Sequence, residues 1–245
     1  MGSRVVVIIP ARYESTRLPG KPLAVIDGKP MIQRVYERAR GIPGIDSVLV
    51  ATDDQRIAAV IRDCGGAAVM TRSTHVSGTD RIAEAAAALD AEVIVNVQGD
   101  LPFLQPSMVA DAVDLLRGDS AVPMATIKTP IRQRAEMENP NVVKVVTDRD
   151  GYAIYFSRSP IPFWRDTVPA SVLGYKHLGV YAYRRDFLLT FTRLAPTPLE
   201  QAEKLEQLRA LESGFRIKVA ETAGGLGVEV DTPEDLERAR AVVAG

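Results

Sequence analysis

The chain has 245 residues, and its 30 lysines and arginines nearly balance its 31 aspartates and glutamates, which gives a formal net charge of −1. This length suits one large α/β domain or one domain with a long insertion, and it excludes a small scaffold stapled by disulfides. The near-zero charge argues against a strongly basic nucleic-acid-binding surface, and 46% hydrophobic residues exclude a disordered chain.

The first 116 residues alternate short apolar runs with amphipathic helical patterns. Strands are predicted over residues 5–9, 47–51, 67–70 and 92–98, and helices over residues 31–40, 54–64, 79–89 and 106–116. This alternation predicts a mostly parallel sheet that is covered on both faces. Ligands bind at the carboxyl ends of such strands, so the candidate ligand loops are those after Ile9, Val50, Met70 and Val97.

The pattern changes after residue 120. Strands are predicted over residues 121–129, 142–147, 152–157 and 175–183, with few helices between them. We expect a single domain over residues 1–245, in which residues 120–185 form an antiparallel or mixed, strand-rich insertion with an apolar face or edge for dimerisation. Asp150-Gly151 predicts a tight hairpin turn. A helix over 199–212, a strand over 216–220 and a last helix opened by Thr232-Pro233 follow.

The single cysteine, Cys64, has no partner for an internal disulfide, which indicates a reducing compartment and predicts a cytoplasmic protein. The apolar run over residues 5–9 is too short for a signal-peptide core or a membrane span. We therefore expect no membrane insertion.

The first candidate ligand loop, residues 10–22, concentrates positive charge directly after a buried strand. Arg12, Arg17 and Lys21 lie within ten residues of one another. Such cations repel unless an anion lies between them, and a triphosphate has the required charge. The loop departs from the Walker A pattern at Ser15 and Pro22. Composition alone leaves a solvated basic loop equally open.

Two aspartates follow apolar segments in positions that suit a divalent cation. Asp100 comes after the strand over 92–98, and Asp231 precedes the last helix. Taken alone, each pattern favours a turn or capping role. If the two carboxylates converge in space, they form a pair able to bind Mg²⁺.

Three other segments carry polar groups of chemical interest. Residues 71–81 offer hydroxyls and arginines at a helix start, which suit either a base or phosphate or ordinary capping by Ser77 or Thr79. His177 lies in a predicted strand, a position that favours a structural histidine. The acidic pair in residues 148–150 falls on the hairpin turn and favours a turn role. With two histidines and one cysteine, a structural zinc site is not supported.

Taken together, these segments resemble the 3-deoxy-D-manno-octulosonate cytidylyltransferase family, whose members are also called CMP-Kdo synthetases. The matching motifs occur in the family's order and span nearly the whole chain: residues 9–12, 15–22, 51–53, 77–81, 96–100, 139–141, 155–158, 177–179, 205–209 and 230–236.

The resemblance implies a fold and a reaction. The fold is the nucleotide-diphospho-sugar transferase fold, a Rossmann-like three-layer α/β architecture with a mixed, mostly parallel sheet and a strand-rich dimerisation extension. The reaction transfers CMP from CTP to 3-deoxy-D-manno-octulosonate (Kdo) with Mg²⁺, releases diphosphate and serves lipopolysaccharide biosynthesis. Members are cytoplasmic homodimers. The implied partners are the two substrates and a second copy of the chain, without nucleic acid.

The resemblance also implies which residues form the site. It assigns the metal to Asp100 and Asp231, and catalysis to these two together with Arg12, Arg17 and Lys21. For CTP the implied residues are Pro10, Ala11, Arg12, Lys21, Ser77, Gly78 and Arg81. For the sugar acid they are Gln98, Arg158, His177, Tyr181, Glu206 and Gln207.

The chain departs from the family pattern at two places, which leave the sugar acid open. Leu101 adjoins Asp100 where a small or acidic residue is more usual, and the glycine-rich segment 224–230 contains Glu229. A related acid, such as 8-amino Kdo, is therefore an alternative substrate. A CMP-sialic acid synthetase typically has R-x-G-S-K-G in its first loop, and here Tyr13-Glu14-Ser15 follow Arg12. A glycosyltransferase would need a credible D-x-D motif, which this chain lacks. A non-catalytic nucleotide-binding protein is the last alternative.

Overall fold

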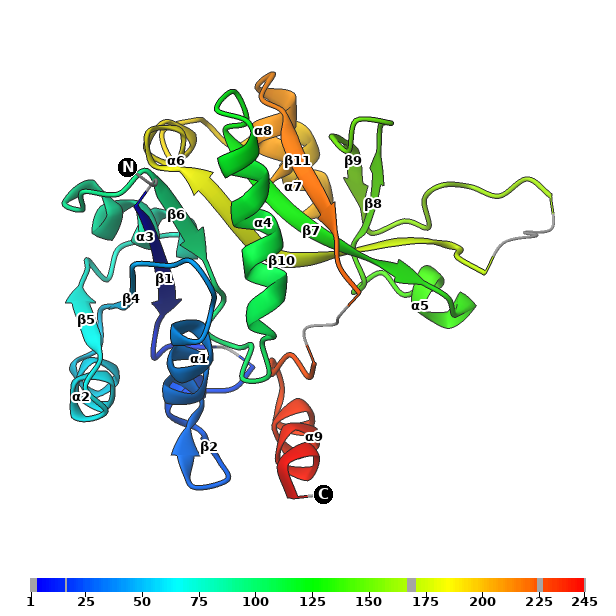
Figure 1. The fold of residues 1–245 in the computed structure, drawn as a ribbon. Helices are drawn as coiled ribbons and strands as arrows, with labels where there is room; N and C mark the ends of the chain where they lie inside the picture. The colour runs from blue at the N-terminus through cyan, green and yellow to red at the C-terminus, as the bar shows by residue number, and fades with distance from the viewer. Residues whose placement is uncertain (1–3, 16, 167–170, 224–226, 245) are drawn as a thin grey trace. The chain divides into compact units, whose positions relative to one another are not determined.

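The computed structural model describes residues 4–15, 17–166, 171–223 and 227–244 (Figure 1). The chain forms two compact units, the first of residues 1–110 and 226–245 and the second of residues 111–225. The boundary falls inside helix α4 (Pro106–Gly118). Thr16 of the first candidate loop and Gly224, Gly225 and Leu226 lie outside the described residues.

A parallel sheet of four strands forms the centre of the first unit. Its strands follow in the order β6-β1-β4-β5, and their bounds are Val93–Asn96, Val5–Ala11, Ser47–Thr52 and Ala67–Met70. Strand β1 pairs on both sides and is almost wholly buried. A strand enclosed in this way reads as a continuous β-branched run in the sequence, which is why β1 was readily predicted.

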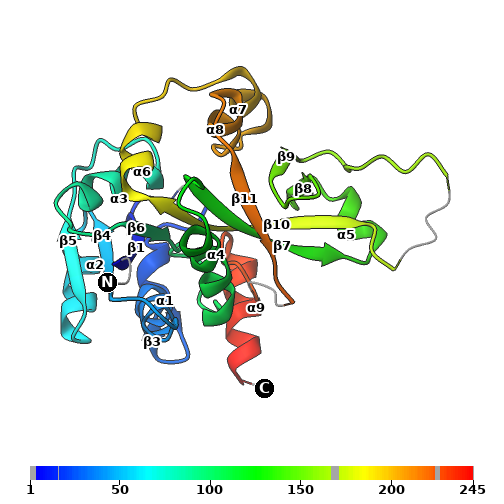
Figure 2. The same ribbon diagram turned by 45° about the horizontal axis from the view of Figure 1, so that its top comes forward.

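Helices cover both faces of this sheet. They are α1 (Met31–Arg40), α2 (Gln55–Asp63) and α3 (Gly78–Ala87), whereas α9 (Pro233–Ala244) packs beside β2. Helix α1 packs on α2 and β4, whereas α3 contacts β1, β4 and β6 from the opposite side (Figure 2). The bounds of α1 and β5 are as predicted, and the other elements of residues 5–116 shift by at most a few residues.

An apolar cluster attaches the C-terminal segment to the start of the chain. Val230, Leu236 and Ala239 pack against Ile26 and Met31. Ile26 belongs to the small hairpin of β2 (Val25–Ile26) and β3 (Lys29–Pro30), which follows a 3-10 turn over Lys21–Leu23. The cluster therefore holds the segment before α9 close to the first candidate loop.

The second unit contains the mixed, strand-rich sheet expected over residues 120–185. Strand β7 (Met124–Ile131) pairs antiparallel with β10 (Gly174–Arg184) and parallel with β11 (Ile217–Glu221). Strands β8 (Lys144–Thr147) and β9 (Ala153–Ser157) form a hairpin, and β8 also pairs with β10. The hairpin turn contains Gly151 at a φ of +78°, as Asp150-Gly151 predicted. Two short helices, α5 (Arg134–Glu138) and α6 (Arg185–Phe191), were not predicted.

The predicted continuous helix over 199–212 is wrong. The structure has two short helices, α7 (Pro198–Glu203) and α8 (Leu208–Glu212), separated at Lys204, whose φ of 54° is left-handed. The Nε of Arg209 donates to Glu200 at 2.8 Å and ties the two pieces together. The break places residues 205–207 in the connection. Within the residues that the structure describes, every helix falls short of the length and apolar character needed to cross a membrane.

Lys144 anchors the β8–β9 hairpin from inside the second unit. Its side chain is fully buried, and its Nζ donates to the carbonyl oxygens of Asn139 and Val142 at 3.0 and 2.6 Å and also to that of Arg158. A buried ammonium surrounded by carbonyl dipoles tolerates no apolar replacement without leaving those oxygens unpaired.

We predict that Lys144→Met lowers the free energy of unfolding by about 3 kcal/mol, because three carbonyls lose their donor. Urea unfolding followed by circular dichroism measures the change. The matched control is Lys176→Met, which removes a half-exposed ion pair with Glu136 and is expected to cost less than about 1 kcal/mol. Equal midpoints for the two variants would contradict the assigned role of Lys144.

Candidate active site

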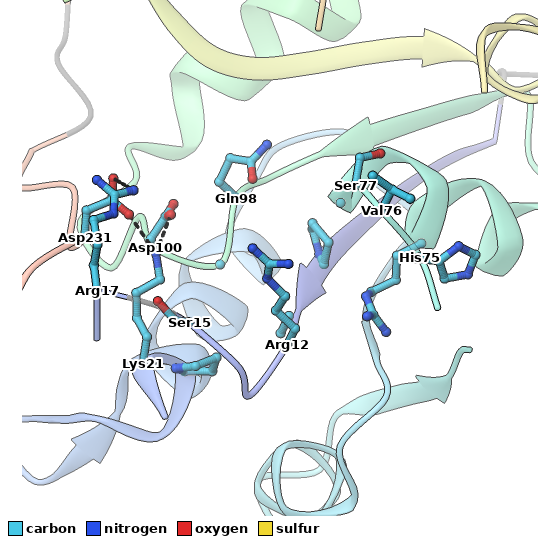
Figure 3. A pocket seen from close by; sticks show the side chains of 16 residues that line it. Arg12, Ser15, Arg17, Lys21, His75, Val76, Ser77, Gln98, Asp100 and Asp231 are labelled. Carbon is cyan, nitrogen blue, oxygen red and sulfur yellow. Dashed lines mark hydrogen bonds and ion pairs between the residues drawn. The ribbon is translucent and has the colours of Figure 1, made fainter. Parts of the chain in front are cut away.

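The loops at the carboxyl ends of the first unit's strands surround a cavity of about 390 Å³ (Figure 3). Every residue of this unit that was predicted for the site lines the cavity: Pro10, Ala11, Arg12, Arg17, Lys21, Ser77, Gly78, Arg81, Gln98, Asp100 and Asp231. The structure thus brings together segments that lie up to 210 residues apart.

Two glycines allow the loops to approach one another. A Cβ on Gly99 would lie 3.0 Å from the carbonyl oxygen of Pro10, so glycine lets the loop after β6 approach the backbone at the end of β1 without displacing it. Gly20 has a φ of +71° and starts the 3-10 turn that carries Lys21. Its amide also donates to the carbonyl of Tyr13 at 3.1 Å, which closes the first loop.

Lys21 lies between the two predicted metal ligands. Its Nζ is 2.9 Å from Asp100 Oδ2 and 3.0 Å from Asp231 Oδ1, as the dashed lines in Figure 3 mark. Arg17 contacts the other oxygen of Asp231 at 3.1 Å. Burial opposes the charge on Lys21, but the two carboxylates outweigh it and raise the pKa of Lys21 above its ordinary value. The ammonium therefore stays charged throughout the physiological range.

Asp100 retains coordinating capacity beyond its contact with Lys21. Its Oδ1 is buried and has no hydrogen-bond partner in the structure, and an orphaned carboxylate oxygen is a costly feature unless a ligand meets it. The backbone of Asp100 is also fixed, because its carbonyl accepts from the amide of Val230 at 3.1 Å. This bond brings Asp231 beside Asp100.

The donor set suits a hard divalent cation. Among the described residues, no group of three or more His, Cys, Asp or Glu side chains gathers as a metal site. Two carboxylates without softer ligands match the preference of Mg²⁺, which keeps several waters and takes phosphate oxygens as its other ligands. The residues present therefore fit that ion.

Two of the three arginines that line the cavity, Arg12 and Arg81, differ in their contacts. Arg12 is exposed, points into the cavity in Figure 3 and has no ion-pair partner within the described part of the chain. Arg81 is buried, and its guanidinium donates to Thr71 Oγ1 at 2.6 Å and to Asp53 Oδ2 at 3.0 Å. Arg12 is available to an anionic ligand, whereas Arg81 is held rigidly in the cavity wall.

The start of α3 forms another wall of the cavity. Ser77 accepts from the amide of Asp80, and Asp80 accepts from the amide of Ser77, so the two form a capping box. Ser77 therefore caps the helix and lines the cavity at once, which joins the two roles that the sequence left open. His75 lines the same wall and bonds to Glu84, which also accepts from the amide of Arg72.

His177 and Tyr181, two residues predicted for the sugar acid, lie in β10 of the second unit. Their rings are 5.4 Å apart, and Phe156 meets the His177 ring edge-on at 4.9 Å. Complete burial lowers the pKa of His177 to about 3, so its ring is neutral. Burial, together with the nearby Glu206 carboxylate, raises the pKa of the Tyr181 hydroxyl.

Gln207 and Arg158 complete the polar groups of the second unit. Gln207 is buried, and its Nε2 has no hydrogen-bond partner in the structure. Arg158 is held by Glu203, whose side chain accepts from its amide at 2.9 Å and whose carbonyl accepts from its Nε at 2.7 Å. The α7–α8 connection of the second unit thus holds a buried amide donor that lacks a partner among the described residues.

The cavity also contains residues that the sequence did not single out. They are Ser15, Pro22, His75, Val76 and Gly99. All five belong to loops already identified at strand ends, so the loops were predictable although the individual side chains were not. The two residues at which the chain departs from the family pattern differ in exposure: Leu101 is buried, and Glu229 is exposed.

Comparison with known proteins gives a consistent result. A family model described as Cytidylyltransferase matches residues 6–218. The chain is 54% identical over 244 residues to the 3-deoxy-manno-octulosonate cytidylyltransferase of Geobacter metallireducens, covering 96% of each chain. It is also 54% identical over 248 residues to the enzyme of that name from Syntrophotalea carbinolica, covering 98% of this chain and 99% of the relative.

Solved structures extend the comparison to three dimensions. The structure of a CMP:2-keto-3-deoxy-manno-octonic acid synthetase complexed with CTP is similar, with a TM-score of 0.94, 48% identity and 99% of both chains covered. A 4-diphosphocytidyl-2C-methyl-D-erythritol synthase from Anaerococcus prevotii shares the fold with a TM-score of 0.64 and 14% identity, over 99% of both chains.

We predict that Asp53→Asn lowers the free energy of unfolding by about 2 kcal/mol, because it leaves the buried Arg81 guanidinium without its counter-charge. Urea unfolding measures the loss. The matched control is Asp90→Asn, which removes an ion pair with Arg4 that is largely exposed on both sides and is expected to change little. If Asp53→Asn unfolds at the wild-type midpoint, Arg81 does not depend on Asp53.

Proposed function

This chain belongs to the 3-deoxy-manno-octulosonate cytidylyltransferase family, and we propose on that premise that it transfers CMP from CTP to Kdo, releasing diphosphate. It has the α/β nucleotide-diphospho-sugar transferase fold of that family. The observation that supports the proposal is the cavity of the first unit. It is lined by Arg12, which has no ion pair with any described residue, and by two carboxylates that share Lys21.

The cations of the first loop suit the triphosphate of CTP. Arg12 offers a planar fork of donors without a competing partner, and Lys21 offers a compact charge. Arg17 is largely exposed, so its contact with Asp231 is readily exchanged for a phosphate. These groups would hold the nucleotide and neutralise the diphosphate as it leaves.

Asp100 and Asp231 are the proposed ligands of Mg²⁺, which would supply positive charge to offset the charge that develops on the transferred phosphate. The unpartnered Oδ1 of Asp100 supports this assignment. When the nucleotide is bound, Lys21 is free to turn from the carboxylates toward a phosphate. The first loop would thereby balance the charge of the two carboxylates in the free protein and bind the phosphates of the substrate in the complex.

The chemical step is a direct displacement. The anomeric hydroxyl of the sugar acid attacks the α-phosphorus in line, and the bond from that phosphorus to the bridging oxygen of diphosphate breaks. No covalent enzyme intermediate is needed, so the protein's contribution is positioning and electrostatic stabilisation. Ser77, Gly78 and Arg81, together with the backbone near Pro10 and Ala11, would hold the cytidine; Gln98 would face the sugar acid.

The sugar acid accounts for the polar groups of the second unit. A polyhydroxylated acid offers many hydrogen-bond donors and acceptors, and the buried Nε2 of Gln207 lacks an acceptor in the structure. The rings of His177 and Tyr181 are neighbours, Glu206 acts on the Tyr181 hydroxyl, and Arg158 would supply a positive charge for a carboxylate. We propose these residues as the sugar-acid subsite.

The assembly and location follow from the same family assignment. We propose a cytoplasmic homodimer that serves lipopolysaccharide biosynthesis, with the strand-rich insertion over residues 120–185 contributing to dimerisation. In the second unit, Phe163 is 86% exposed and Trp164 is 42% exposed. Exposed aromatic residues of this kind are typical of a surface covered by another chain. Sedimentation at varied protein concentration tests the oligomeric state.

We predict that Asp100→Asn lowers diphosphate release by at least about 100-fold without unfolding the protein, because an amide is a poor ligand for the cation that stabilises the transferred phosphate. The assay contains CTP, Mg²⁺ and Kdo. The matched control is Asp114→Asn, which removes an exposed helical ion pair with Arg117 and leaves turnover unchanged. Near-normal turnover by Asp100→Asn would show that Asp100 is only a turn residue.

The same assay tests the substrate. We expect diphosphate release with Kdo and none after chelation of divalent cations, because the carboxylate pair then has no metal to hold. Activity with sialic acid alone would favour a sialic acid synthetase, and no activity with any acid would favour a nucleotide-binding protein.

A further inference from the structure

Thr126, on β7 of the second unit, touches a residue of the proposed sugar-acid subsite. The side chain is fully buried, and its Oγ1 lies 2.9 Å from the Nε2 of His177. The same oxygen lies 2.7 Å from the carbonyl oxygen of Val180 and 3.3 Å from that of Leu178. A threonine hydroxyl carries one hydrogen and accepts through its lone pairs.

A bulge in β10 explains why these carbonyls face a side chain. The register of β10 on β7 shifts between Leu178 and Tyr181, with Leu178 opposite Ile127 and Tyr181 opposite Thr126. The extra residues of β10 fall outside the regular ladder, so the carbonyl of Val180 takes its hydrogen bond from Thr126. Bulges of this kind re-aim side chains near functional sites.

The contacts of the Thr126 hydroxyl indicate one state of the histidine. The hydroxyl has a single hydrogen and makes its shortest contact, 2.7 Å, with the carbonyl oxygen of Val180, which can only accept, so the hydrogen is assigned to that carbonyl. Toward His177 the hydroxyl must then accept, which requires a hydrogen on Nε2. Because the buried ring is neutral, its other nitrogen, Nδ1, carries a lone pair. No described residue provides a hydrogen-bond partner for Nδ1.

We propose that Thr126 is a positioning residue for the sugar-acid subsite, which holds His177 in its Nε2-H tautomer so that Nδ1 accepts a hydrogen bond from a hydroxyl of the substrate. The proposal rests on the proposed function for the identity of the substrate. The tautomer itself follows from the geometry of Thr126 and the bulge.

This arrangement determines what the subsite selects. An acceptor that the bound ligand shields from water favours a ligand that offers a donor, because a ligand without one leaves the lone pair desolvated and unpaired. A hydroxyl group satisfies Nδ1. A deoxy or methoxy analogue at the contacted position does not, and is expected to bind about tenfold more weakly or worse.

The tautomer is tested directly by long-range proton–nitrogen NMR of protein labelled with ¹⁵N-histidine at neutral pH. The chain has only two histidines, and loss of signals in His75→Gln assigns the remaining ones to His177. We expect Nε2 at the chemical shift of a protonated nitrogen and Nδ1 at that of an unprotonated one. A hydrogen on Nδ1, or a doubly protonated ring, would overturn the proposal.

The positioning role is tested by the kinetics of Thr126 variants. Thr126→Val is nearly isosteric and removes the hydroxyl, so it is expected to raise the KM for Kdo about tenfold while the KM for CTP stays within about twofold. Thr126→Ser keeps the hydroxyl and is expected to restore the KM for Kdo to near the wild-type value. An unchanged KM for Kdo in Thr126→Val, or no rescue by Thr126→Ser, would contradict the role.

The two proposals fail in different ways. The NMR measurement uses the wild-type protein without substrate, so it reports on the tautomer even if Thr126→Val folds poorly. Absence of diphosphate release by the wild-type protein with Kdo would defeat the proposed function and leave the tautomer standing. Turnover with Kdo combined with a hydrogen on Nδ1 would defeat only the role of Thr126.

Discussion

Two carboxylates that lie side by side need a cation between them. The way in which the loops of the first unit meet depends on this requirement. Asp100 and Asp231 both contact the ammonium of Lys21. Without the lysine the carboxylates would repel each other across a short distance. Three segments far apart in the sequence meet here, and the backbone bond from Val230 to Asp100 together with the apolar packing of α9 holds them in place. The negative charge that would receive a metal is therefore already balanced in the free protein.

Both units also contain buried polar atoms whose partners are missing. Asp100 Oδ1 in the first unit and Gln207 Nε2 in the second are each buried without a hydrogen bond. Such atoms reduce stability, and proteins retain them where a ligand supplies the missing partner. In the proposed tautomer of His177, Thr126 satisfies one ring nitrogen and the other is left for the substrate. Ligand binding would therefore supply the hydrogen-bond or metal partners that these atoms lack in the free protein.

The fold of the first unit was predictable because its strands are buried runs and its helices have one apolar face, as β1 and α1 illustrate. The site loops were predictable for the same reason, since parallel strands end at one edge. The split between α7 and α8 was not, because the pattern of leucines continues through the left-handed turn at Lys204. Lys144 and Thr126 carry no sequence signal either: their roles depend on carbonyls contributed by a neighbouring loop and by a bulge.

Asp100 and Asp231 share the ammonium of Lys21 in the free protein, and we propose that Mg²⁺ would take this position in the working enzyme. The most direct test is the Mg²⁺ dependence of the melting temperature of Lys21→Met. Without metal this variant is expected to melt below the wild type, and added Mg²⁺ is expected to raise its melting temperature more than that of the wild type, an effect lost in the double variant with Asp100→Asn. An equal response of Lys21→Met and wild type to Mg²⁺ would contradict the claim.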